Sequence, residues 1–345
     1  MSHDHLAKKV RRVGRPRERA DDRIARRADG TPAALRQRFL FRLASGAVLR
    51  DAQEIARLKA LAVPPAYVDV RYAADAAAHL QAVGTDAAGR LQYRYHPCWT
   101  EVREALKARR LAGLARMLPD IERAVAKALA AEIVDLPFVL AAVVRLVSLS
   151  AIRAGSEEYA RAHGTRGATT LLKSNVELAD GVVTLQFKAK GGKLVSKQVR
   201  DARLHAALAA LMALPGRRLF QYRAADGAVR SVRTGEVNAY LHTVAGRRIS
   251  LKDFRTLSAS ASALEALAAT EPASSERARR AQVRQVVSAV AEELANTPAV
   301  CRRSYVHEAV VTAFEQGTLA RLRKPSRSAA KKAQTLARLV SRHSA

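Results

Sequence analysis

Residues 296–305 read NTPAVCRRSY, and this stretch says more about the fold and the function than any other part of the chain. Thr297 is a favourable N-cap residue and Pro298 suits the first position of a helix, so the spacing predicts a helix that begins at Thr297. Tyr305 then lies about two turns into this helix. Apolar residues continue the helical spacing as a stripe of Val306, Ala309, Val310, Ala313 and Phe314. Tyr305 falls at the edge of this stripe, beside Cys301.

Two interpretations of Tyr305 are open at this point. Its place at the edge of an apolar stripe favours a half-buried structural tyrosine. The neighbouring Arg302 and Arg303 favour a different role, because a tyrosine hydroxyl surrounded by arginines can attack a phosphodiester. The second interpretation requires further cations, from other parts of the chain, that converge on Tyr305.

The charge of the whole chain favours a nucleic-acid partner. The 345 residues include 60 Lys and Arg against 31 Asp and Glu, a formal net charge of +29. Such a balance favours a polyanion, and nucleic acid over a membrane surface. No apolar run approaches the ~18 residues of a transmembrane helix, and the first residues lack the apolar core of a signal peptide. Cys98 and Cys301 are far apart without metal-ligand spacing, so we expect a reducing compartment, no zinc site and a cytoplasmic, nucleoid-associated protein.

Composition divides the chain into two domains with basic ends. Residues 1–33 are polar, basic and without apolar periodicity, which predicts a disordered arm. Residues 34–115 predict a small β-rich N-terminal domain, and residues 116–320 a mainly helical domain with a three-stranded sheet. Residues 321–345 predict a basic tail, in which residues 333–340 can form a helix on a partner. The expected fold class is therefore α+β.

The individual elements follow from periodicity and turn signals. In the first domain we expect strands at 39–41, 67–72, 79–83 and 91–95, with a hairpin turn at 84–89 and helices at 51–61 and 100–114. In the second we expect helices at 121–129, 139–149, 236–244, 251–268 and 281–295. The strands of its sheet are expected at 176–178, 182–187 and 194–199.

The basic arm contains a short motif of its own. Gly14-Arg15-Pro16-Arg17 is similar to the core of an AT-hook, in which extended arginines lie in an A·T-rich minor groove. Arg15 and Arg17 are therefore candidate DNA contacts. A generic basic tail that contacts only phosphates is the other open interpretation.

Three further segments supply cations. Ser250 and Asp253 have the spacing of a capping box, and the helix that they begin carries Arg255 at the edge of an apolar face. An arginine held there is destabilising unless it is paired, so a structural salt bridge and a phosphate clamp are both open. Arg153 ends a long apolar helix before Gly155, and Lys190 lies at the turn of a β-hairpin. Each feature alone also fits an ordinary structural or surface role.

Together these segments resemble one family, the type IB DNA topoisomerases of the bacterial, poxvirus-like branch. The order and approximate spacing of its motifs are matched by Ile-Arg-x-Gly at 152–155, the hairpin lysine at 190, KDFRT at 252–256, NTP at 296–298 and RSY at 303–305. In the first domain, VPPAYVDV at 63–70 and GRLQYRYH at 89–96 resemble motifs of the same branch. The resemblance covers roughly residues 35–318 and leaves out both basic ends. It implies a fold like that of tyrosine recombinases and topoisomerases IB.

The chain departs from the family pattern at Ser156, Ala168, Ala189, Gly191 and Leu257. None of these departures removes a candidate catalytic side chain. Ala189 and Gly191 alter the hairpin around Lys190, so Lys188 and Lys193 stay open as alternatives to it.

The resemblance implies a mechanism. Tyr305 would attack a backbone phosphorus, form a 3′-phosphotyrosyl bond and release a 5′-hydroxyl that later reseals the strand. Arg153 and Arg255 would stabilise the transition state, since planar guanidinium groups suit two phosphate oxygens at once. Lys190 would be the general acid, with Lys252 or Arg153 relaying a proton, and Asn296 would donate a hydrogen bond to a phosphate oxygen. The covalent bond conserves the phosphodiester energy, so the resemblance implies neither ATP, nor a metal, nor another cofactor.

The partner implied is double-stranded DNA, enclosed by a monomeric clamp. Candidate contacts in the first domain are Gln92, Tyr93 and Tyr95; in the second they are Tyr159 and Lys252. Packing of the two tyrosines on one face of a strand is the alternative for that pair, because residues two apart point the same way.

Two rival functions are a tyrosine recombinase or integrase and a non-enzymatic nucleoid DNA-binding protein. Recombinases usually carry His where Lys252 stands, which favours the topoisomerase. Workable side chains at all five candidate catalytic positions argue against a non-enzymatic binder.

Overall fold

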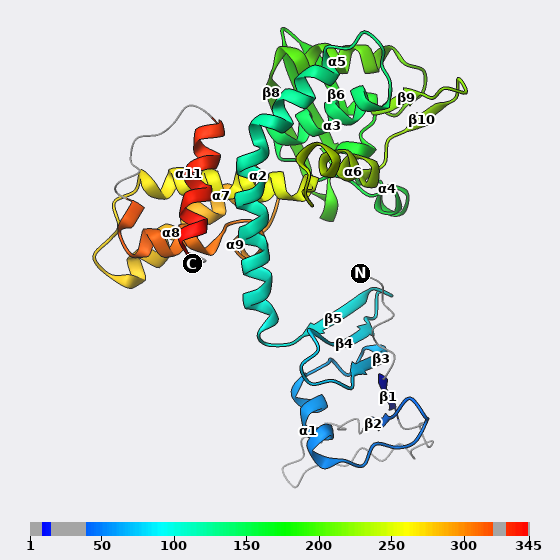
Figure 1. Ribbon diagram of the computed structural model, residues 1–345, viewed down its shortest axis with the longest axis vertical. Helices are drawn as coiled ribbons and strands as arrows, with labels where there is room; N and C mark the ends of the chain where they lie inside the picture. Colours follow the sequence, from blue (N-terminus) through cyan, green and yellow to red (C-terminus); the bar gives the residue numbers. More distant parts are fainter. Residues whose placement is uncertain (1–8, 15–38, 320–328, 344–345) are drawn as a thin grey trace, which may run out of the picture. The chain divides into compact units, whose positions relative to one another are not determined.

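The computed structural model describes residues 9–14, 39–319 and 329–343. The chain forms two compact units, Met1–Glu104 and Ala105–Ala345 (Figure 1). The boundary falls inside a helix, earlier in the chain than residue 115, where we expected the first domain to end. The mixture of a β-rich first unit and a mainly helical second unit confirms the expected α+β class.

The first unit is built on a five-stranded antiparallel sheet in the order β2-β1-β3-β4-β5. Its strands are β1 (Lys9–Gly14), β2 (Phe39–Arg42), β3 (Val68–Ala73), β4 (Leu80–Thr85) and β5 (Leu91–Tyr95). Its small core is formed by Phe41, Leu58, Val70, Tyr72 and Ala82. The strands between residues 39 and 95 match the expected ranges within a few residues, because alternation and turn residues agree there.

The basic arm is a correction. Residues 9–14 form β1, which pairs with β2 on one side and β3 on the other, so a disordered arm over all of residues 1–33 is wrong for this segment. Pairing on both sides satisfies the backbone donors and acceptors whatever the polarity of the sequence, and side-chain periodicity therefore gave no signal. Arg15 and Arg17 lie outside the described residues.

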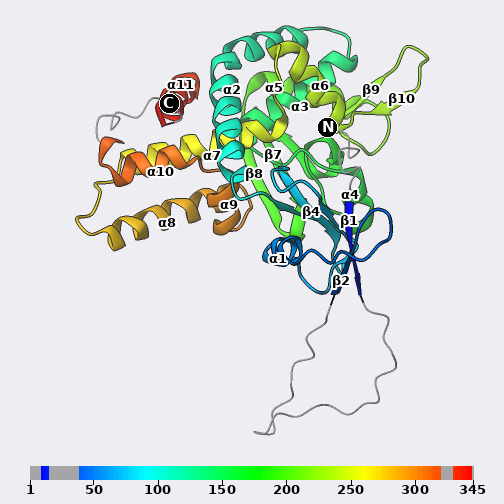
Figure 2. The ribbon, with the colours of Figure 1, turned by 60° about the horizontal axis from the view of Figure 1, so that its bottom comes forward.

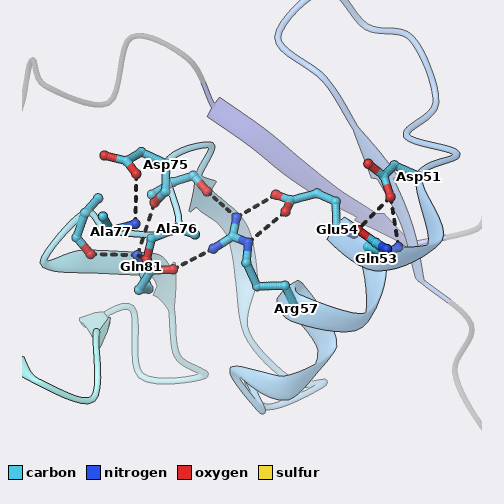
Figure 3. Close-up of polar contacts among 10 residues, drawn as sticks. Asp51, Gln53, Glu54, Arg57, Asp75, Ala76, Ala77 and Gln81 are labelled. Carbon is cyan, nitrogen blue, oxygen red and sulfur yellow. Dashed lines mark hydrogen bonds and ion pairs between the residues drawn. The ribbon is translucent and has the colours of Figure 1, made fainter.

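Arg57 of helix α1 (Ala52–Ala60) forms hydrogen bonds that connect this helix to the sheet (Figure 3). Arg57 forms an ion pair with Glu54 and donates to Gln81 Oε1 over 2.6 Å and to the carbonyl of Ala73 over 2.8 Å. Gln81, which is almost fully buried, donates in turn to the carbonyl of Ala78 over 2.6 Å. The hydrogen bond to Glu54 is the main cause that raises the pKa of Arg57. This network places a charged side chain at low exposure without leaving it unpaired.

The second unit surrounds helix α3 (Leu136–Ser150), most of whose side chains are buried. Around it lie the sheet β6-β7-β8 (Val176–Ala179, Val182–Lys188, Leu194–Arg200), which confirms the expected three strands, and the helices α5 (Ala202–Ala213), α6 (Thr234–Ala245) and α7 (Leu251–Ala268). Helices α8 (Glu276–Glu293), α9 (Pro298–Ser304) and α10 (Glu308–Glu315) follow, and α7 contacts both α8 and α10 (Figure 2).

Several elements of this unit differ from expectation. The helices expected at 100–114 and 121–129 are one helix, α2 (Trp99–Leu129), which continues through Pro119. The short helix α4 (Glu157–His163) and the hairpin of β9 (Gln221–Arg223) and β10 (Val229–Ser231) were not expected. They are too short to show a clear periodicity in the sequence.

The C-terminal helix α11 (Ala329–His343) is another correction, because it belongs to the folded unit rather than to a basic tail. It contacts α7 and α10 of the same chain (Figure 1). An apolar stripe at helical spacing is buried there, formed by Ala333, Leu336, Ala337 and Val340. Lys332 forms an ion pair with Glu265 of α7 at 2.7 Å. The stripe expected to bind a partner is therefore buried against the chain itself.

Candidate active site

The candidate cations are held by the C-terminal ends of two helices. Ala151 is the C-cap residue of helix α3 and Ala295 follows helix α8, both with positive φ (52° and 48°), so the last carbonyls turn away from their helices. Arg255 Nη1 donates to the carbonyl of Ala151 and Arg255 Nη2 to that of Leu294 over 3.1 Å. Arg153 Nη1 donates to the carbonyl of Ala295 over 3.2 Å. Carbonyls at helix C-termini carry partial negative charge, which offsets the repulsion between the two guanidinium groups.

Arg255 is the most buried of these cations. Only 3% of it is exposed, and its Nε has no hydrogen-bond partner in the described part of the chain. Its Cζ lies 5.2 Å from the centroid of the Tyr305 ring, within the range of a cation–π contact. Burial is the main cause that lowers the pKa of Arg255; Tyr305 opposes this and Arg153 adds to it. Backbone carbonyls and the Tyr305 ring surround this guanidinium, and no carboxylate of the described residues forms an ion pair with it.

The segment around Tyr305 differs from the single helix that we expected. Helix α9 ends at Ser304, Tyr305 is its C-cap residue, and α10 begins only after the N-cap residue His307. The amide of Val306 shares the carbonyl of Cys301 with the amide of Tyr305, which closes the turn. Tyr305 is half-buried, as its place at the stripe edge predicts. The break turns the chain between two short helices and places the tyrosine at the corner.

Ser260 connects the turn at Tyr305 to α7, the helix that carries Arg255. Its hydroxyl is fully buried, donates to the carbonyl of Tyr305 over 2.8 Å and accepts from the amide of His307 over 3.1 Å. Ser260 and Arg255 both belong to α7. The backbone of the tyrosine and the guanidinium that contacts its ring therefore share one rigid support.

Cys301 is the other nucleophilic side chain near this corner. It is fully buried, and burial raises the pKa of its thiol to about 11. A protonated, enclosed thiol is a poor nucleophile. Tyr305 is thus the better candidate.

Of the hairpin lysines, Lys193 contacts Asn296. Asn296 Nδ2 is buried and has no hydrogen-bond partner among the described residues, so the amide keeps a donor available. Lys193 Nζ donates to the carbonyl of Asn296 over 2.6 Å. Lys190 is exposed, and its Nζ lies 4.8 Å from the ring centroid of Tyr159 on α4. Lys188 is exposed at the end of β7. Of the three lysines, Lys193 thus contacts Asn296 and Lys190 contacts Tyr159.

Two family profiles match the chain. Residues 99–333 match the family described as eukaryotic DNA topoisomerase I, catalytic core, and residues 38–86 match the bacterial DNA topoisomerase IB N-terminal domain. DNA topoisomerase 1B of Acanthamoeba polyphaga mimivirus is 31% identical over 261 residues, which are 74% of this chain and 78% of that protein. The chain belongs to the type IB DNA topoisomerases. It is therefore an enzyme of a family that acts on DNA.

Solved structures of a recombinase are also similar to parts of this topoisomerase. The XerH site-specific recombinase bound to difH substrate, a pre-cleavage complex, aligns with a TM-score of 0.35 and 13% identity, covering 58% of this chain and 52% of that one. Its post-cleavage complex with palindromic difH substrate gives the same TM-score and identity, covering 59% and 50%.

The candidate DNA contacts of the topoisomerase's first unit lie on the edge strand β5. The rings of Tyr93 and Tyr95 stack with centroids 6.2 Å apart, and Tyr95 stacks on Trp99 at 5.7 Å. Both tyrosines stay exposed, at 39% and 44%. Gln92 donates to Asp86 over 2.9 Å. Hydrogen bonding from Arg90 is the main cause that lowers the pKa of Asp86 to about 2. The tyrosines thus pack on each other and are still partly exposed to solvent.

In the second unit Tyr159 is partly exposed on α4 and Lys252 is exposed in the first turn of α7. The structure therefore places Arg255 against the ring of Tyr305, Arg153 on the carbonyl of the residue before Asn296, and Lys190 beside Tyr159.

Sequence reasoning missed Lys197 on β8. Its Nζ donates to the carbonyl of Ser150 over 2.7 Å, next to the carbonyl that holds Arg255, and both lysine and arginine line one small pocket. Burial, followed by Arg255, lowers the pKa of Lys197. The available signal was alternation, because Lys197 stands between Val195 and Val199 on the buried face of the strand.

No helix of residues 9–14, 39–319 and 329–343 is long and apolar enough to cross a membrane. Across the same ranges, no group of three or more His, Cys, Asp or Glu side chains is arranged to hold a metal ion.

Proposed function

We propose that this enzyme relaxes supercoiled duplex DNA by cleaving one strand through a 3′-phosphotyrosyl bond to Tyr305 and then religating it. The observation that carries this proposal is the position of Arg255. Its guanidinium is fixed by two carbonyls and lies 5.2 Å from the Tyr305 ring centroid. A buried, preorganised donor beside a half-buried tyrosine suits charge that develops only in a transition state.

In the cleavage step the Tyr305 hydroxyl oxygen bonds to phosphorus and the bond from phosphorus to O5′ breaks. The phenolic proton passes to solvent water, and O5′ receives a proton from the general acid to become the 5′-hydroxyl. Arg153 and Arg255 donate to the non-bridging oxygens, and the Nδ2 of Asn296, which has no partner among the described residues, supplies another donor. Religation reverses every bond change. The intact strand and the free 5′ end allow rotation between the two steps.

No step of this cycle needs an external energy source, because the phosphotyrosyl bond conserves the energy of the phosphodiester bond that was broken. We expect purified enzyme to relax supercoiled plasmid in excess EDTA without ATP. Gel electrophoresis of topoisomers over time tests this. Relaxation only after magnesium or ATP is added would contradict the proposed mechanism.

A general acid must protonate O5′, and we propose Lys190, with Lys252 or Arg153 relaying the proton. Lys188 and Lys193 are the alternatives, and Lys193 lies on the carbonyl of Asn296. A substrate in which sulfur replaces O5′ at the scissile position distinguishes the three lysines as candidate general acids. A thiolate leaves without protonation, so the loss of the general acid does not slow cleavage of this substrate. Lys190→Ala is expected to lose about 10²–10⁴ in the single-turnover cleavage rate on the oxygen substrate and to recover near the wild-type rate on the sulfur substrate.

Lys188→Ala and Lys193→Ala are the matched controls, because they remove the same charge from the same hairpin. We expect little change in the sulfur-to-oxygen rate ratio for either. If the ratio rises for Lys193→Ala instead, the general acid is Lys193 and the assignment of Lys190 is wrong.

We further propose that the enzyme acts as a monomer, that both units contact one duplex in a clamp, and that it is cytoplasmic and associated with the nucleoid. The exposed rings of Tyr93 and Tyr95, together with Tyr159 and Lys252, support contacts from each unit. The net charge of +29 supports strong attraction to the DNA backbone.

A further inference from the structure

Three arginines outside the candidate active site gather where two segments of the second unit pair. Leu172 and Arg218 form an isolated antiparallel bridge, the amide of Leu219 donates to the carbonyl of Leu171 over 3.1 Å, and that of Lys173 to the carbonyl of Arg217 over 3.0 Å. Arg166 precedes the first of these segments. These backbone bonds place Arg217 and Arg218 on a fixed support.

The charges of this arginine cluster (Arg166, Arg217 and Arg218) are poorly balanced. Arg218 Nη2 forms an ion pair with Glu157 at 2.5 Å, while its Nη1 is buried without a hydrogen-bond partner in the described part of the chain. Burial lowers the pKa of Arg166, and Arg218 and Arg217 lower it further while Glu157 opposes them. Of the three guanidinium groups, Arg218 forms the ion pair with Glu157, and the cluster with this carboxylate carries a net positive charge.

The arginine cluster is coupled to the candidate active site through a short loop. Glu157 begins α4, just after the loop that carries Arg153. The amide of Ala168 donates to the carbonyl of Arg153 over 2.7 Å, and that of Thr169 to the carbonyl of Ala154 over 2.8 Å. A Cβ on Gly167 would lie 2.6 Å from the Arg153 carbonyl oxygen, so only glycine permits this approach. Arg153 and the arginine cluster are therefore held on one tight framework.

We propose that Arg166, Arg217 and Arg218 form a second phosphate-binding site, which holds a backbone phosphate of the duplex other than the one that is cleaved. The proposal rests on the proposed function, because it concerns the same DNA. Planar guanidinium groups bind phosphate oxygens in pairs, and the buried Nη1 of Arg218 is a donor that such an oxygen can satisfy. Contacts of this kind fix the register of the protein on DNA without reading its sequence. The site would therefore set where the scissile phosphate lies relative to Arg153.

The test is the salt dependence of DNA binding by the full chain carrying Arg166→Ala and Arg217→Ala. Both substitutions keep the backbone bonds that join the two segments, so the fold should be retained, which circular dichroism checks. Binding to a short fluorescent duplex is measured over a series of salt concentrations. Both arginines are proposed to contact one phosphate, so losing that contact should make the slope of log K against log salt shallower by about 0.9.

Two control variants make the result specific. Arg277→Ala with Arg280→Ala removes the same charge from the exposed face of α8 and should leave the slope unchanged. Arg166→Lys with Arg217→Lys should keep the slope but weaken binding, because the charge stays and the paired donors are removed. An unchanged slope in the alanine pair, or an equal change in the α8 pair, overturns the proposal.

Failure of this inference differs from failure of the proposed function. If the wild-type enzyme does not relax plasmid, the proposed function is wrong. If it relaxes plasmid while the alanine pair keeps the wild-type slope, only the second phosphate site is wrong.

Discussion

Tyr305→Phe is expected to abolish plasmid relaxation and to leave no covalent adduct when the reaction is stopped with detergent. The substitution removes only the hydroxyl oxygen that would bond to phosphorus. The ring that contacts Arg255 stays, and so do the backbone bonds of residue 305 to Cys301 and Ser260. Affinity for duplex DNA, measured by fluorescence anisotropy, should therefore stay close to that of the wild type.

Tyr240→Phe is the matched control for this experiment. Tyr240 is also half-buried, in α6, and burial raises the pKa of its hydroxyl. It lies on a different helix from the candidate catalytic cations, so its variant should relax plasmid at the wild-type rate. Relaxation by Tyr305→Phe at a comparable rate would exclude Tyr305 as the nucleophile and reopen the structural interpretation of its half-buried ring.

The sequence predicted best those elements whose local signals agree. Helix α7 begins and ends where expected, at Leu251 and Ala268, because Asp253 Oδ2 accepts from the amide of Ser250 as the capping box predicts and an apolar face follows. The three strands of the second unit were likewise bounded by glycines. The break after Ser304 was not predicted, since the apolar stripe continues through it and only the tertiary bonds of Ser260 reveal the turn.

For the candidate site, the sequence identified the residue types and the resemblance implied their roles. Neither identified the groups that hydrogen-bond to these side chains in the fold. Arg255 was expected to need a carboxylate or a phosphate, and it is held by the carbonyls of Ala151 and Leu294. These carbonyls are far from Arg255 in the sequence. They belong to the ends of two helices that come close only when the whole unit has folded. Backbone acceptors have no sequence signature, so such a pairing escapes pattern analysis. For the same reason the sequence does not reveal the acceptor of Lys197, which is the carbonyl of Ser150.

Arg255→Lys is expected to lower the single-turnover cleavage rate by about 10²–10³, the effect of removing one preorganised transition-state donor. Lysine keeps the positive charge but replaces a planar fork with one ammonium group. A single Nζ cannot reach the carbonyls of Ala151 and Leu294 and also present a donor to phosphate in the guanidinium geometry. DNA affinity should change little, because the charge that attracts the backbone is retained.

Arg145→Lys is the control that separates chemistry from stability. Arg145 is also partly buried in the second unit, where it forms an ion pair with Asp201 at 2.5 Å. Its variant should unfold at a lower temperature and cleave DNA at the wild-type rate below that temperature. Arg255→Lys should instead lose rate at temperatures where circular dichroism shows it folded. A wild-type rate for Arg255→Lys would mean that charge alone suffices at this position, and the two helix-end carbonyls would then serve only to keep the cation beside Tyr305.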